Sequence, residues 1–136
     1  MAALHPDQAS PDRAETAFRF LDDLDFIRGD RWITGGESFR DGWRLAYVCE
    51  AVTVTVEYLD QQFEVSFMRD DVEADYLLID RELFGQRSGL AGNMFPPDKL
   101  GQVIDAVAAD IRENYGAILR GDDDVWARIE KIVRAS

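Results

Sequence analysis

Residues 43–68 read WRLAYVCEAVTVTVEYLDQQFEVSFM, and this stretch decides the fold. Apolar and polar residues alternate along it with a period of two, which is the spacing of a strand with one buried face. The turn-forming pair Asp60 and Gln61 interrupts the alternation and separates two strands. Because these connections are too short for parallel crossovers, we expect an antiparallel meander.

Strands are expected at residues 43–49, 52–58 and 63–67, and a shorter apolar run at 76–79 predicts one more. The expected sheet thus spans residues 31–80. The alternation places Cys49 on the same face as Trp43, Leu45 and Tyr47. That position favours a small buried hydrophobic residue over a reactive thiol.

Helices are predicted on both sides of the meander. Ser10 and Pro11 form a helix start, and apolar residues then recur at helical spacing to about residue 27, with Gly29 as the stop. A long helix begins at residues 97–98, and a short one follows residues 122–124, whose three aspartates suit a helix N-terminus better than a metal site.

The predicted class is therefore α+β: a four- or five-stranded, mainly antiparallel meander, packed on one face by an N-terminal helix and a long C-terminal helix, plus a short final helix. Residues 1–9 are expected to be a disordered tail and residues 10–136 a single domain.

The composition narrows the range of partners. The 136 residues carry a net charge of −12, which opposes binding to nucleic acid or to anionic membrane surfaces. One cysteine excludes an intrachain disulfide and suits a reducing compartment. No apolar stretch is long enough for a signal sequence or a membrane span. We therefore expect a cytoplasmic protein.

Catalytic residues are scarce. The only histidine is His5, in the expected tail, and Cys49 has no histidine to activate it. A carboxylate-dependent enzyme stays open as an alternative, because Glu50, Glu57 and Glu64 could converge across neighbouring strands. We expect no catalytic activity, since no arrangement of residues meets the geometric roles of a site.

No cofactor or metal site is predicted either. Four acids between residues 71 and 82 have the spacing of a calcium loop, but Tyr76 stands where that loop needs glycine. The glycines of the 85–97 segment lack the lysine and hydroxyl residue that end a phosphate-binding loop.

Negative charge gathers in the middle of the chain. Residues 57–82 hold nine acids and two arginines, a net charge of −7. Such a surface is either a solvated sheet edge or an interface for a basic partner, and both interpretations stand at this point. The candidate binding residues are the acids Glu57, Glu64, Asp70, Asp71, Glu73 and Asp75, with Met94 or Phe95 as an apolar anchor.

In outline the chain resembles the small acidic immunity proteins of bacterial polymorphic toxin systems. The resemblance rests on size, acidity, helix–meander–helix order and the absence of catalytic residues, and it includes no diagnostic motif. It implies a non-catalytic protein that binds a toxin, with its negative face in the basic active site of a nuclease-like partner. A homodimer is compatible with this function.

The alternative is a small-molecule binding or sensing domain. Its pocket would lie between the sheet and the long helix, beneath the glycine- and proline-rich segment 85–97. Tyr47, Tyr58 and Tyr115 are the polar residues that could point into such a pocket.

Overall fold

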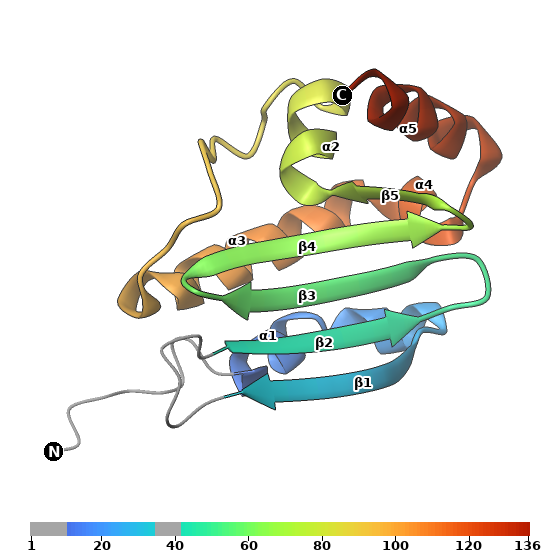
Figure 1. Ribbon diagram of the computed structural model, residues 1–136. Helices are drawn as coiled ribbons and strands as arrows, with labels where there is room; N and C mark the ends of the chain where they lie inside the picture. Colours follow the sequence, from blue (N-terminus) through green and yellow to red (C-terminus); the bar gives the residue numbers. More distant parts are fainter. Residues whose placement is uncertain (1–10, 35–41) are drawn as a thin grey trace, which may run out of the picture.

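The computed structural model describes residues 11–34 and 42–136, so the expected tail, with His5, lies outside the described residues. Five strands and six helices make up the described fold (Figure 1). The strands are β1 (Ile27–Thr34), β2 (Gly42–Val48), β3 (Thr53–Leu59), β4 (Gln62–Arg69) and β5 (Val72–Asp75). The helices are α1 (Pro11–Ala17), the 3-10 helix η2 (Arg19–Leu24), α2 (Tyr76–Leu83), α3 (Pro97–Asn114), α4 (Gly116–Arg120) and α5 (Asp123–Ala135).

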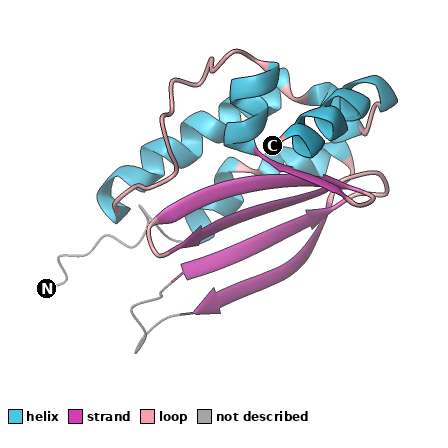
Figure 2. Cartoon of the chain, turned by 45° about the horizontal axis from the view of Figure 1, so that its top comes forward, coloured by secondary structure: helices cyan, strands magenta, loops and turns pink. Residues whose placement is uncertain are grey.

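The sheet is a simple antiparallel meander with the strand order β1-β2-β3-β4-β5. Helices α1 and α3 lie behind it, and α2 and α5 lie beyond its β5 edge (Figure 1). In Figure 2 the helices are gathered behind and above the strands, and the opposite face of β1 to β4 carries no described helix. The predicted α+β class is confirmed, with five strands.

The core lies between the sheet and the helices behind it, chiefly the long helix α3. Every second residue of β2, β3 and β4 is buried in this core, as the alternation in the sequence predicts. The buried strand residues are Trp43, Leu45, Tyr47, Val54, Val56, Tyr58, Phe63, Val65 and Phe67, and they meet Leu100, Ile104, Val107, Ala108 and Ile111 of α3. Cys49, which follows β2, is half-buried against this core.

The N-terminal helix is shorter than predicted. The α-helix ends at Ala17, and after η2 the chain turns at Asp25, which has a left-handed backbone with φ of 68°. The amide of Phe26 then donates to the carbonyl of Leu21 at 3.1 Å, and the Phe26 side chain enters the core. Burial of Phe26 therefore ends the helix and begins β1.

The predicted strand at 76–79 is wrong, because these residues begin α2. Asp75 accepts a hydrogen bond from the amide of Leu78 at 2.9 Å and so caps the helix. Tyr76, Ile79 and Asp80 are buried on one side of it. A run of four apolar residues is too short for its period to distinguish a strand from a helix. Here the hydrogen bond from Leu78 to the Asp75 cap favours the helix. The fifth strand is formed by residues 72–75 instead.

The aspartates at 122–124 do lie where a helix begins, but Asp122 makes no side-chain cap hydrogen bond. Its carboxylate pairs with Arg120, and that of Asp123 pairs with Arg69 on β4. These acids stabilise the start of α5 through its dipole and fasten it to the sheet.

The segment between α2 and α3 completes the edge of β4. Strand β5 pairs only with the second half of β4. Along the first half, the amide of Phe63 donates to the carbonyl of Asn93, and that of Phe95 to the carbonyl of Gln61, both at 2.8 Å. The segment therefore satisfies backbone groups of β4 that β5 leaves unpaired.

Candidate functional site

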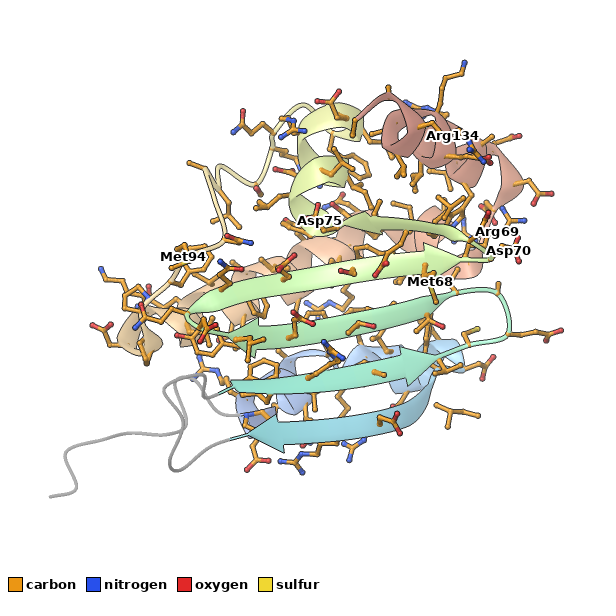
Figure 3. All side chains as sticks on the ribbon, viewed as in Figure 1. Met68, Arg69, Asp70, Asp75, Met94 and Arg134 are labelled. Carbon is orange, nitrogen blue, oxygen red and sulfur yellow. The ribbon has the colours of Figure 1, made fainter. Side chains whose placement is uncertain are left out.

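The face of the sheet that no described helix covers holds most of the predicted binding residues. Glu57 of β3 lies directly opposite Glu64 of β4. On the next strand pair, Ser66 faces Asp75 and Met68 faces Glu73. Opposed residues of a sheet share a face, so these side chains project together from what we call the open face. Met68 and Asp75 are labelled in Figure 3.

The surroundings of Glu64 on the open face raise its pKa. Partial burial raises the pKa of Glu64, and the nearby carboxylates of Glu57, Asp75 and Glu73 raise it further. Glu57 has Glu64 on one neighbouring strand and Arg44 of β2 on the other, and Arg44 donates a hydrogen bond to its carboxylate at 3.0 Å. Four carboxylates from three strands thus form one acidic cluster, with Glu64 at its centre.

A groove adjoins this cluster where the sheet meets the helices. It has a volume of about 600 Å³. Its sheet wall is formed by Glu64, Ser66, Glu73, Ala74 and Asp75, and its other walls by Leu77, Leu78 and Arg81 of α2 and by Val133 and Ser136 at the end of α5. Three of the four acids of the cluster therefore border a concave surface large enough to receive a side chain from another molecule.

An apolar row crosses the same face at its other end. Ile27, Val48 and Met68 are 73%, 44% and 40% exposed. Ile27 pairs with Val48, Val48 with Thr53, and Thr53 with Met68, so the three side chains follow one line across four strands. The small residues Ala46, Thr55 and Ser66 form the next line, between this row and the pair Glu57 and Glu64. Glu73 lies opposite Met68 and so continues the apolar row.

The remaining predicted residues lie at the margins. Asp70 and Asp71 form the turn between β4 and β5, where Asp70 has a φ of 56°. Glu130 and, more weakly, Asp71 raise the pKa of Arg134. Met94 is exposed and pairs with Gln62, which places it at the opposite end of the open face from Asp70 (Figure 3).

Phe95 packs against the core and not on the open face. Of the two candidate apolar anchors, only Met94 therefore shares a face with the acidic cluster. The apolar row was missed by the sequence analysis, although a signal existed. Val48 and Met68 are apolar residues at positions where the alternation expects solvent-facing ones.

A cavity also lies under the 85–97 segment, beside α3. The tyrosines expected there do not line it. Tyr58 donates its hydroxyl to the carbonyl of Phe95 at 2.8 Å, while the hydroxyls of Tyr47 and Tyr115 are buried and have no partner among the described residues. Burial raises the pKa of Tyr47 to about 12. The tyrosine that lines the cavity is Tyr76.

Within residues 11–34 and 42–136, no group of three or more acidic, histidine or cysteine side chains is arranged to hold a metal ion. No helix in the described part of the chain is long and apolar enough to cross a membrane. Glu50, in the connection after β2, stands apart from the opposed pair Glu57 and Glu64. Comparison with protein-family models, with curated proteins and with solved structures finds no match.

Proposed function

We propose that this protein is a non-catalytic binding domain whose open face binds a basic protein. The observation that carries the proposal is that one uncovered sheet face combines a four-acid cluster with a row of exposed apolar side chains. Such a face has the components of an interface: apolar area for affinity, and charge for orientation and rate.

The acidic cluster is unfavourable for the fold itself. Like charges directly opposite one another on a sheet destabilise it, and Glu64 has three acids near it. Solubility needs charge on the surface but does not need it concentrated at one point. Residues that oppose folding stability are characteristic of functional sites, where binding compensates for the repulsion.

The apolar row supports the same conclusion. Single exposed apolar residues are common, but Ile27, Val48 and Met68 are aligned on neighbouring strands. The residues beside them are small, so a partner's backbone can approach the sheet closely there. A partner with apolar side chains flanked by lysine or arginine would complement both halves of the face.

A basic toxin or nuclease fits this chemistry, in line with the resemblance to immunity proteins. An inhibitor of such a protein places carboxylates where the toxin binds phosphate groups. In this proposal Glu57, Glu64 and Glu73 take that role, and a basic side chain enters the groove beside Asp75.

A pull-down from a lysate of the source organism tests the proposal, using wild type and two matched variants. E57Q/E64Q/E73Q removes three of the four negative charges of the acidic cluster and leaves Asp75 to cap α2. D22N/D23N/E113Q removes the same charge from exposed positions elsewhere. A basic protein should be retained by wild type and by the second variant at low salt, released at high salt, and not retained by the first variant. Equal capture by both variants would contradict the proposal.

A further inference from the structure

A second site lies between α3 and the segment that follows α2. The cavity has a volume of about 300 Å³, which is at the lower end of the range for small-molecule sites. One wall is a single face of α3, formed by Gln102, Val103, Ala106, Val107 and Asp110, and the other wall is formed by Tyr76, Arg87, Ser88 and Leu90. It shares no residue with the acidic cluster.

The outer wall is held in place by a buried carboxylate. Asp80 is only 1% exposed, and it accepts hydrogen bonds from the amide of Ser88 at 3.1 Å and from its hydroxyl at 2.6 Å. The Ser88 hydroxyl in turn accepts from the amide of Leu90 at 3.1 Å. These bonds fix the backbone of residues 88–90 in the wall of the cavity, so this wall is ordered before any ligand arrives.

The backbone of this wall has an unfavourable conformation at Gln86. Gln86 has a left-handed backbone with φ of 63°, which is unfavourable for a residue with a side chain. Its amide donates to the carbonyl of Asp80 at 2.7 Å. Asp80 therefore fixes the segment through both its carboxylate and its carbonyl, and the strain at Gln86 is compensated by these bonds.

The polar end of the cavity is already neutral. Asp110 accepts from Tyr76 at 2.6 Å, from Arg87 at 2.5 Å and from Asn114 at 2.8 Å. The charge of Arg87 is thus matched, and its guanidinium lies 4.9 Å from the centre of the Phe84 ring. A charged ligand would find no unmatched counter-charge here, whereas a hydroxyl or amide could bond to Tyr76, Asp110 or Gln102.

We propose that this cavity binds a small neutral molecule with an apolar body and one hydroxyl or amide group. The apolar body would lie against Val103, Ala106, Val107 and Leu90, and the polar group at Tyr76 and Asp110. Protein cavities of about half this volume bind benzene, so a single ring fits. This site is independent of the open face and of the function proposed for it.

The test is an NMR titration of the whole protein with benzyl alcohol, compared with benzoate and benzylammonium as charged molecules of the same shape. Benzyl alcohol should shift the amides of Leu90, Val103, Ala106 and Val107 in a saturable way. The charged molecules should bind at least about tenfold more weakly, because neither finds an unmatched counter-charge. Saturable shifts centred elsewhere, no saturable shifts, or equal binding of the charged molecules would overturn the proposal.

Two variants with the same new side chain sharpen the test. A106F fills the cavity, and E113F places a phenylalanine on an exposed position of α3 outside it. Binding should be lost in A106F and kept in E113F. Retained binding in a folded A106F would overturn the proposal, and the titration of the unmodified protein decides the matter if A106F does not fold.

Discussion

Glu57 and Glu64 face each other directly across strands β3 and β4, on the side of the sheet that no described helix covers. Opposed carboxylates repel, and the repulsion is increased by Glu73 and Asp75 nearby. The fold tolerates this because the buried side of the same strands supplies the stability. In the function proposed above, this pair lies where the open face would meet a basic partner.

Replacing Glu64 by glutamine should stabilise the protein at pH 7, by on the order of 0.5 kcal/mol. The folded-state pKa of Glu64 is raised above its ordinary value of 4.5, so the ionised form is disfavoured in the folded state. This destabilisation is absent below pH 4.5, grows as the pH rises through the folded pKa, and is complete above it. Urea unfolding at pH 7 and at pH 4 should show the gain of E64Q at pH 7 only, and an equal gain at both values would contradict this explanation.

Gly121 should tolerate alanine less well than Gly85 does. Both have a left-handed backbone, with φ of 73° and 69°, so each substitution carries the same strain of about 1–2 kcal/mol. A Cβ at Gly121 would also lie 2.7 Å from the Cβ of Ala51, whereas one at Gly85 meets nothing within 4 Å. Thermal or urea unfolding should rank G121A below G85A, and equal loss would show that the close contact has no effect.

Ser88→Ala should loosen the wall of the cavity. Asp80 loses its hydroxyl donor and keeps only the backbone amide of residue 88, which should reduce the free energy of unfolding by about 1–3 kcal/mol. Hydrogen exchange at the amide of Leu90 should become faster, because that amide donates to the same hydroxyl. S136A, at the exposed C-terminus, is the control and should change stability by less than about 0.5 kcal/mol.

Tyr76→Phe should raise the pKa of Asp110. Burial acts to raise this pKa, but hydrogen bonds from Tyr76, Arg87 and Asn114 outweigh it and hold the pKa below the ordinary value of 3.8. The stability from this ionised group is present above the unfolded pKa and is lost as the pH falls through the folded one. NMR titration of the Asp110 carboxyl should show its midpoint at a higher pH in Y76F.

The control for this titration is Y115F. It removes a buried hydroxyl that has no hydrogen-bond partner among the described residues. The midpoint of Asp110 should therefore stay at the wild-type value. A shift in Y115F as large as that in Y76F would contradict a specific role for the Tyr76 hydroxyl.

The sequence predicts the central sheet well because half-buried strands have a strict period of two, and 43–68 keeps that period. It fails at 76–79, where four apolar residues have no readable period and the Asp75 cap decides for helix. It also fails at 27–30, where a bulge in β1 disturbs the alternation. Both failures concern the edges of the sheet, at β1 and next to β5.

The acids of the candidate face could be found from charge density alone, and strand parity then brings Glu57 and Glu64 together. Glu73 could not be placed on that face, because the last strand was expected at 76–79 and not at 72–75. The apolar row could not be completed, because Ile27 had been assigned to a helix. The cavity beside α3 could not be predicted either. Its wall depends on the hydrogen bonds between Ser88 and Asp80, and such bonds leave no periodic pattern in the sequence.

The most direct test of the open face is site-specific photo-crosslinking in a lysate of the source organism. A benzophenone amino acid at Thr55 lies between the apolar row and the pair Glu57 and Glu64, and one at Glu113 lies at an exposed position of α3. We predict that Thr55 crosslinks to a basic protein, that high salt and E57Q/E64Q/E73Q abolish this product, and that Glu113 does not give it. No product from Thr55, the same product from both positions, or a product unaffected by the triple substitution would contradict the account.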